Sequence, residues 1–444
     1  MNTHLRRWGL MSLTLAVALL ATACLPEGMR VPQSEFLAAL ERKSGLIAYL
    51  GVDNNIYIVD QSGTTPTQVT QDAHADGDYL VYGLPVWSPD GQSLTFAGYE
   101  GQGENAPDQA SLYVAQKDGS QLSQVYTGAD YLIYYYWAPD SQRVSFLSNT
   151  SGSSLALKII SMLGGEAETL DAGNPYYWTW APDSHSLLVH VGGAADDNPQ
   201  ARLSRLEISD QVNEHGLDIR PTEFKAPAFS PDGKKLLVAG ETESGTPALL
   251  LTDAAGGAPK SLTEYTGNIA FAWSPDSKRV AYISSENTQI GVLGDLTVVD
   301  PEGKQEPVTL PDEQVYAFFW SPDGKSIAYF SPKRVEQPTP EPGSGSSSGD
   351  SGDESIIWSL SVMDAKDGSA RAIASFFPTD RFLQVLPYFD QYHQSSTIWS
   401  PDSKNLLVSA YARDGSPGIF VVAASGNLDP RFIADGIVGF WSWK

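Results

Sequence analysis

Short apolar runs separated by polar turn sequences make up most of this chain. Seven of the turns share a five-residue motif, in which an aromatic residue precedes Ser or Ala, then Pro-Asp, then Gly or Ser. An apolar run of strand length follows each motif, for example at 94–96 and 187–189. Brief β-rich runs bounded by turn residues predict antiparallel strands, and we find no long stretch with the 3.6-residue period of a helix. The seven copies begin at Trp87, Trp137, Trp180, Phe229, Trp273, Trp320 and Trp399.

The motif predicts how consecutive strands connect. Pro presets the backbone for a tight turn, Ser and Asp oxygens can accept backbone N–H bonds there, and Gly tolerates the exit geometry. Counting a truncated copy at Trp441, the copies lie 42–50 residues apart, except for 79 residues between Trp320 and Trp399. This spacing accommodates four short strands, and four-stranded antiparallel units repeated radially form a β-propeller. The sequence therefore predicts an all-β fold.

The two ends of the chain predict how the propeller closes. Residues 44–71 contain three strand-like runs with no motif before them, whereas 437–443 supply one strand that stops where the Pro-Asp turn would begin. We therefore expect one blade to combine a C-terminal strand with three N-terminal strands. This gives eight four-stranded blades over 44–444. Seven is the alternative, because the outer strands are weakest in the unit at 180–222.

The aromatic residues of the motif are interpreted as core. Each lies near the base of an inner strand, where it can pack between neighbouring blades, and Trp441 occupies the same position in the truncated copy. A buried aromatic side chain removes about 150–250 Å² from water, so these positions predict a core distributed between blades.

The N-terminus predicts export. Residues 1–23 have the pattern of a signal peptide, with Arg6 and Arg7 before an apolar stretch that ends in Ala-Thr-Ala. The next residue is Cys24, the only cysteine of the chain, and this segment resembles a bacterial lipoprotein signal. The resemblance implies that Cys24 is lipidated and anchors the protein outside the cytoplasmic membrane, either on that membrane or on an outer one. The alternative is a simple cleavage after Ala23, with Cys24 incidental.

Two further segments have no repeat character. Residues 24–43 are expected to be a tether with a short helix that Ser34 caps. Residues 335–354 are rich in Pro, Gly and Ser, so we expect a disordered insertion between the second and third strands of one blade.

The repeated Trp-Ser-Pro-Asp-Gly motif, followed by a Leu/Ile-Ala-Tyr/Phe strand, resembles the TolB-like family of WD-type propellers. The resemblance covers about residues 44–444. It implies a propeller, but the family includes translocation-associated proteins, lipoproteins of unknown role and propellers attached to serine peptidases. Because the motif marks a hairpin rather than a site, the resemblance implies little about activity. The chain departs from the TolB pattern in its larger number of blades and in lacking a separate N-terminal α/β domain.

Few residues suggest catalysis or a cofactor. Residues 345–349 match Gly-x-Ser-x-Gly, but they lie in a Gly/Ser tract rather than at a strand–helix elbow. His185 and His190 are five apart on one strand and should point to opposite faces. The acidic residues at 72, 76 and 78 lack the spacing of a calcium loop. We therefore expect no catalytic residue, cofactor or metal, and the net charge of −25 argues against nucleic acid.

Aromatic residues before three of the motifs are the candidates for binding. Inner strands line a propeller channel, and aromatic side chains with polar tips suit peptide or sugar contacts. Because alternate strand residues must point into the core, each candidate could instead be a core residue. The candidates are Tyr131, Tyr134, Tyr136, Tyr176, Trp178, Tyr388, Tyr392 and His393.

These observations favour a non-catalytic, lipid-anchored propeller that binds a protein, a peptide or another component of the cell envelope. The membrane would be contacted only through the anchor. The alternative is an enzyme that acts on glycans or peptides at the channel mouth, and a third possibility is a structural subunit of a larger complex.

Overall fold

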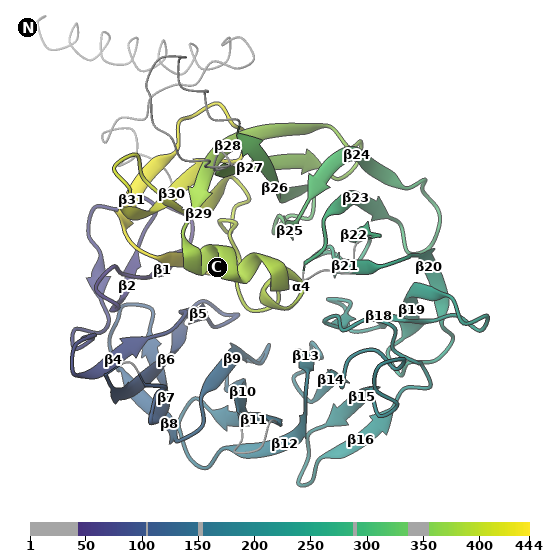
Figure 1. Ribbon diagram of the computed structural model, residues 1–444, viewed down its shortest axis with the longest axis horizontal. Coiled ribbons are helices and arrows are strands. Elements are labelled where there is room, and N and C mark those ends of the chain that lie inside the picture. The colour runs from purple at the N-terminus through teal and green to yellow at the C-terminus, as the bar shows by residue number, and fades with distance from the viewer. Residues whose placement is uncertain (1–42, 104, 150–153, 287–290, 336–354) are drawn as a thin grey trace, which may run out of the picture.

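The computed structural model describes residues 43–103, 105–149, 154–286, 291–335 and 355–444. Its small antiparallel sheets are arranged radially around a central axis, which is a β-propeller (Figure 1). The signal segment, Cys24, nearly all of the tether and the insertion after Val335 lie outside the described residues. Among the residues described, no helix has the length and apolar character needed to cross a membrane.

Five sheets of the described chain have four strands. In hydrogen-bonded order, the first consists of β3 (Thr67–Gln68), β2 (Ile56–Val59), β1 (Ile47–Leu50) and β32 (Val438–Trp441). The second consists of β12 (Glu168–Gly173), β11 (Leu155–Ser161), β10 (Arg143–Asn149) and β9 (Leu132–Trp137), and the third of β13 (Tyr176–Trp180), β14 (Ser186–Val191), β15 (Arg202–Glu207) and β16 (Asn213–Gly216). The fourth consists of β17 (Ala228–Phe229), β18 (Lys235–Glu241), β19 (Pro247–Asp253) and β20 (Lys260–Glu264), and the fifth of β21 (Asn268–Trp273), β22 (Val280–Ser285), β23 (Gly294–Val299) and β24 (Val308–Val315).

Two further sheets are larger. In one, β4 (Asp78–Tyr82) and β5 (Val86–Trp87) both pair with β6 (Ser93–Gln102), which is followed by β7 (Gln109–Gln116) and β8 (Ser123–Gly128). The other runs through β25 (Ala317–Trp320), β26 (Ser326–Val335), β27 (Ser355–Asp364), β28 (Ala370–Pro378), β29 (Asn405–Tyr411), β30 (Pro417–Ala423) and β31 (Arg431–Asp435). This seven-stranded sheet carries two motif copies, so the blade count depends on whether it is divided, and eight stays a prediction.

The ring closes as the sequence predicts. Strand β32 pairs antiparallel with β1, so that Ile47 faces Trp441 and Leu50 faces Val438. Next to this ladder, the Ser442 amide donates to the Leu46 carbonyl at 2.7 Å, and the Leu46 amide donates to the Ser442 hydroxyl at 2.9 Å. The C-terminal strand thus completes a sheet whose other three strands come from the N-terminal end, and the predicted closure is confirmed.

The five motif turns that have Ser at the second position are held by the same hydrogen bonds. The Ser88 hydroxyl donates to Asp90 Oδ1 at 2.6 Å and accepts from the Ser93 amide at 2.9 Å. Equivalent Ser–Asp bonds of 2.7 Å recur in the turns that begin at Ser230, Ser274, Ser321 and Ser400. In one of them, the Ser230 hydroxyl and Lys234 lower the pKa of the Asp232 carboxyl to about 2.

The fifth motif position joins neighbouring blades when it is Ser. The backbone there is left-handed, with φ near +60° at Ser184 and Ser277, a conformation that strains any residue with a Cβ. The Ser184 hydroxyl accepts from the Asp140 amide of the preceding blade at 2.9 Å, and Ser277 accepts from the Asp232 amide at 3.0 Å. Ser44 takes the same role for Asp402, at 3.1 Å, across the closure.

These bonds predict different effects of Ala and Gly at position 277. We expect Ser277→Ala to lower the free energy of unfolding by about 1 kcal/mol, because it removes the bond to Asp232 and keeps the strained φ. Ser277→Gly removes the same bond but relieves the strain, so it should cost less. Urea denaturation of the two variants would measure the difference, and an equal or larger cost for Gly would contradict the argument.

Most of the motif aromatics are buried between blades. Only Phe229 is half-buried among the eight, and the others are buried. Three indoles bond to the carbonyl that precedes the aromatic residue of the neighbouring blade. Trp137 Nε1 donates to Val86 at 3.1 Å, Trp320 Nε1 to Ala272 at 3.4 Å, and Trp399 Nε1 to Phe319 at 2.9 Å.

Trp273 offers a test of this packing. We expect Trp273→Ala to lower the free energy of unfolding by about 3–5 kcal/mol, because it leaves a cavity in the cluster that includes Leu237 and Phe271. Since Trp273 Nε1 has no hydrogen-bond partner among the described residues, Trp273→Phe should cost less than Trp273→Ala. Thermal melts of both variants would test this. A melting temperature lowered by less than one degree in the Ala variant would contradict the placement of Trp273 in the core between blades.

Candidate functional site

A helical segment fills the centre of the ring, and we call residues 379–396 the plug. It contains α3 (Asp380–Val385), η2 (Leu386–Tyr388) and α4 (Phe389–Tyr392). The Thr379 hydroxyl caps α3 by accepting from the Phe382 amide at 3.4 Å. In Figure 1 the plug lies across the middle of the ring. Along the chain it connects β28 to Thr397, which forms a bridge with Trp441.

The plug corrects one sequence expectation. Tyr388, Tyr392 and His393 were expected to lead into an inner strand, but they lie in η2, in α4 and directly after it. The physical reason is the spacing of Phe382, Val385, Leu386 and Phe389, which places four apolar side chains on one face of a helical segment. All four are buried.

Polar and aromatic contacts hold the plug to inner strands around the ring. The Phe389 ring lies 4.9 Å from that of Phe318 in β25, between centroids. The Gln391 side chain donates to the Trp178 carbonyl at 2.9 Å and accepts from the Trp178 amide at 3.4 Å. Asp390 Oδ2 accepts from the Ala226 amide at 3.1 Å. The axis of the ring is therefore occupied by the protein's own chain.

Several of the candidate aromatics contact the plug or are buried near it. The Tyr134 hydroxyl donates to the Gln391 carbonyl at 3.1 Å, and its ring lies 4.9 Å from that of Tyr392. Tyr136 donates to the Trp178 carbonyl at 3.3 Å, and Trp178 is fully buried. Tyr176 is also buried and donates to Asp171 at 2.7 Å. These side chains have partners within the protein.

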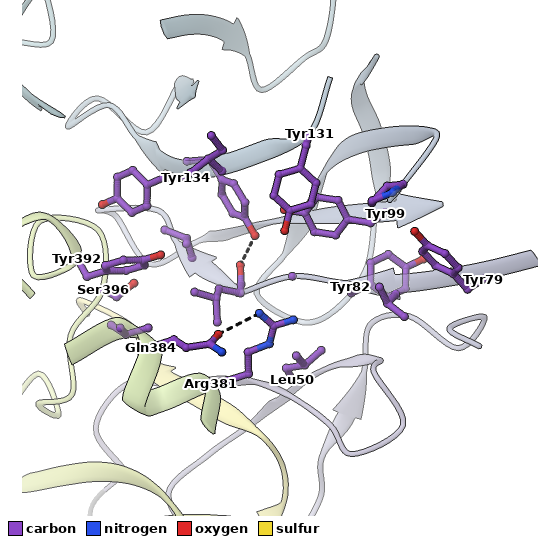
Figure 2. Close-up of a pocket in the computed structure, with 18 residues that line it drawn as sticks. Leu50, Tyr79, Tyr82, Tyr99, Tyr131, Tyr134, Arg381, Gln384, Tyr392 and Ser396 are labelled. Carbon is purple, nitrogen blue, oxygen red and sulfur yellow. Dashed lines mark hydrogen bonds between the residues drawn. The ribbon is translucent and has the colours of Figure 1, made fainter. Parts of the chain in front are cut away.

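Tyr131 and Tyr388 are the candidates that remain exposed, by 45% and 43%. The Tyr131 ring stacks on Tyr99, with centroids 4.7 Å apart, at the edge of a pocket of about 310 Å³. Figure 2 shows this pocket between the strands that carry Tyr82, Tyr99 and Tyr134 and the helix that carries Arg381 and Gln384.

The pocket is lined mainly by tyrosine rings and alkyl groups. The lining residues are Leu50, Tyr79, Val81, Tyr82, Gly83, Leu84, Val86, Tyr99, Pro107, Tyr131, Ile133, Tyr134, Tyr135, Arg381, Gln384, Val385, Tyr392 and Ser396. Burial raises the pKa of the Tyr99 hydroxyl well above its usual value, and that of Tyr392 to about 12. Both phenols therefore stay neutral at physiological pH.

Many of the tyrosine hydroxyls in the pocket already donate to the protein. Tyr99 donates to the Leu132 carbonyl at 2.7 Å, and Tyr135 donates to the Leu84 carbonyl at 2.6 Å. Tyr82 donates to the Asp72 carboxylate at 2.8 Å. The pocket consequently presents ring faces more than free hydroxyl protons.

Of the described residues that line the pocket, Arg381 alone is charged. Its Nη1 donates to Gln384 Oε1 at 3.3 Å within the same helix. Among the residues that the structure describes, no acidic side chain lines the pocket and none forms an ion pair with Arg381. The pocket therefore combines an apolar, aromatic wall with one available guanidinium.

Two histidines lie at the plug but outside the pocket lining: His190 is buried beside it, and His393 is half-buried within it. His190 is buried in β14, with Nδ1 2.9 Å from the Lys225 carbonyl and Nε2 3.0 Å from the Gly193 carbonyl. His393 Nδ1 lies 3.0 Å from the Phe389 carbonyl. Over the described ranges, no three His, Cys, Asp or Glu side chains are placed to hold a metal ion.

The two histidines predict a pH dependence of stability. Burial lowers the pKa of both His190 and His393, so the unfolded chain binds protons that the folded chain does not. The free energy of unfolding should therefore fall as the pH drops from about 7.5 to about 5. Because the neutral amide does not titrate, His393→Gln should flatten this dependence, whereas His185→Gln, at an exposed position, should leave it intact. Denaturation at several pH values would measure this. If the free energy of unfolding fell equally steeply with pH in both variants, the prediction would be wrong.

Sequence reasoning missed Arg381 and most of the tyrosines that line the pocket. Arg381 belongs to a helix that was not expected, and the available signal was the apolar spacing within 382–389. Tyr135 belongs to an inner strand that was expected, whereas strand β4, which carries Tyr82, was not expected, and Tyr99 lies beyond the run expected at 94–96. Nothing local to these residues indicates that they meet the plug.

The fold defines this chain as a β-propeller protein. No family model matches it. A curated relative, named as an uncharacterized peptidase YuxL of Bacillus subtilis, is 26% identical over 207 residues, which cover 45% of this chain and 28% of the relative. The chain thus spans about a quarter of that protein's length.

Solved structures show the same fold at low identity. The dihydro-heme d1 dehydrogenase NirN is similar with a TM-score of 0.54 and 14% identity, over 95% of this chain and 78% of that one. TolB from Acinetobacter baumannii gives a TM-score of 0.38 and 18% identity, over 61% of this chain and 64% of that one. At these identities the likeness to solved structures concerns the fold and leaves the activity open.

Proposed function

We propose that this protein is a non-catalytic propeller of the cell envelope that binds a protein or peptide on the face carrying the plug. The observation that carries the proposal is the plug itself. It occupies the centre of the ring and presents exposed apolar side chains there, such as Leu383 and Tyr388. Tyr131 and Ile133, at the edge of the pocket, are also exposed.

Exposed apolar side chains grouped on one face are typical of interaction surfaces. The opposite face carries the Ser-Pro-Asp turns, where the exposed Leu163 lies beside the turn at 138–142, since the Met162 amide donates to the Gln142 carbonyl at 2.9 Å. Binding to the plug face can therefore be compared with binding to the turn face in the same molecule.

Site-specific photo-crosslinking in the native cell tests the proposal. A photoreactive residue at Leu383 or Ile133 should give a discrete crosslinked species, whereas the same residue at Leu163, on the turn face, should not. Equal crosslinking from both faces, or none from the plug face, would contradict binding there.

The alternative is an enzyme acting on glycans or peptides. The relative named as a peptidase favours it, but the match covers a minor part of that protein. Incubation of the purified protein with peptides and oligosaccharides, followed by mass spectrometry of the products, should show no turnover. Turnover by the purified chain would replace the proposal with the enzymatic alternative.

We further propose that Cys24 is lipidated and anchors the propeller to a membrane outside the cytoplasm. The support is the position of the chain's only cysteine, directly after a signal-like segment. Mass spectrometry of the mature N-terminus should find a lipid-modified Cys24, and Cys24→Ala should release the protein from membranes. An unmodified N-terminus would contradict the anchor.

A further inference from the structure

We propose that the tyrosine-lined pocket binds the carboxyl terminus of a peptide whose last residue is hydrophobic. The inference rests on the proposed function, because it names the part of the partner that the plug face would recognise. Four properties of the pocket support it: its charge, its wall, its depth and the availability of its arginine.

The charge of the pocket selects a single anionic group. Arg381 is the one charged side chain that the described chain contributes to the lining, and the planar guanidinium fits a carboxylate through two parallel hydrogen bonds. The chain as a whole carries a net charge of −25, which opposes ligands with several negative charges. A ligand with one carboxylate beside an apolar group satisfies both conditions, whereas Arg381 would repel a cationic ligand.

The wall of the pocket selects an apolar group rather than a sugar. Tyr82, Tyr99 and Tyr135 use their hydroxyl protons on Asp72 and on the backbone, so they have none left for sugar hydroxyls. Their rings remain as contact surfaces, together with the alkyl groups of Leu84 and Val385. Aromatic and aliphatic walls of this kind favour a hydrophobic side chain.

The depth of the pocket favours the end of a chain. Leu50, Val86 and Tyr135 line it and are buried, whereas Arg381 and Tyr131 are exposed. A side chain can thus enter towards the buried wall while its own carboxylate stays at the exposed edge with Arg381. The volume of about 310 Å³ is at the lower end for ligand pockets and suits one or two residues.

Arg381 is available for this role. Its side chain bonds to Gln384 in the same helix, at an exposed position, and no strand of the ring depends on this bond. Figure 2 shows both side chains projecting from α3 towards the tyrosines of the pocket. The exposed position also means that a substitution of Arg381 should leave the fold intact.

Matched peptides test the inference on the full-length chain in detergent. The probes are labelled hexapeptides of neutral polar residues that end in Leu, Phe or Trp, each prepared as the free acid and as the C-terminal amide. Fluorescence anisotropy should show the free acids binding at least about tenfold more tightly than the amides, because only the acids pair with Arg381.

Two variants of equal charge separate the pocket from the general field of the protein. Arg381→Gln should weaken free-acid binding about tenfold and leave amide binding unchanged, and Arg381→Lys should recover part of the loss. Arg413→Gln is the control, because Arg413 is an exposed arginine in the loop after β29, whose Tyr411 pairs with Phe377 close to the plug. It should bind like the unchanged protein.

Three results would overturn the inference: equal binding of acids and amides, no binding of any free acid at millimolar concentration, or binding of a glucuronic acid disaccharide in place of the peptides. Discrete crosslinking from Leu383 and Ile133 alongside any of these would leave the binding propeller standing and reject only the peptide terminus. Absence of crosslinking together with tight, Arg381-dependent binding of free acids would support the peptide terminus as a ligand of the pocket and reject a partner in the cell at Leu383 and Ile133.

Discussion

A chain that ends at Gly436 should lose its cooperative unfolding transition. The deletion removes strand β32 and leaves β1 without its partner on the inner side of the sheet. It also removes Phe440 and Trp441, which are buried, and the Trp441 amide that donates to the Thr397 carbonyl at 3.0 Å. Burying a side chain such as Trp441 stabilises a protein by about 3–5 kcal/mol, as judged by truncation to Ala, so the ring should open.

The deletion should be compared with a chain that lacks only Lys444, which keeps all of β32. Limited proteolysis and thermal melts would show rapid cleavage and no sharp transition for the longer deletion, and nearly unchanged behaviour for the shorter one. Trp441→Ala should lie between the two. If the chain ending at Gly436 resisted proteases as well as the full chain does, pairing of β32 would not be what closes the ring.

The repeat motif allowed the fold to be predicted because its residues act locally. Pro and Asp set the turn, and Ser or Gly at the fifth position adopts a left-handed conformation that few other residues tolerate. The same short sequence therefore produces the same hairpin wherever it occurs. The closure followed from counting strands at the two ends, and β1 and β32 pair as that count requires.

The plug was missed for reasons visible in the sequence. The interval from Trp320 to Trp399 exceeds the longest other interval by 29 residues, and residues 336–354 account for only 19 of them. The plug lies in the same interval, and its helices are shorter than the stretch over which a helical period is usually recognised. The available signal was a residue suited to an N-cap, Thr379, followed by the apolar positions within 382–389 at helical spacing.

The candidate site was harder to predict than the fold because it depends on contacts between distant residues. Gln391 bonds to Trp178, 213 positions earlier, and no local pattern links the two. The aromatic positions identified from the sequence do lie around the axis, but Tyr134 and Trp178 contact the plug there. Arg381 could not be predicted as a site residue, because a lone surface arginine has no sequence signature.

Replacing both Phe382 and Phe389 by Ala should release the plug and lower the free energy of unfolding by about 6 kcal/mol or more. Each ring is buried, Phe382 lies 5.6 Å from Phe330 and Phe389 lies 4.9 Å from Phe318, between centroids. Truncation of a buried Phe costs about 3–5 kcal/mol. The two losses act on one segment, so hydrogen exchange should speed up throughout the plug.

The matched control is the pair Leu383→Ala and Tyr388→Ala, which removes two exposed side chains from the plug. Because surface truncations usually change stability by less than about 0.5 kcal/mol each, this variant should unfold at nearly the same urea concentration as the unchanged protein. A control that lost as much stability as the Phe variant would show that the plug is held by its outward face. The buried contacts of Phe382 and Phe389 would then not be what holds the plug at the axis.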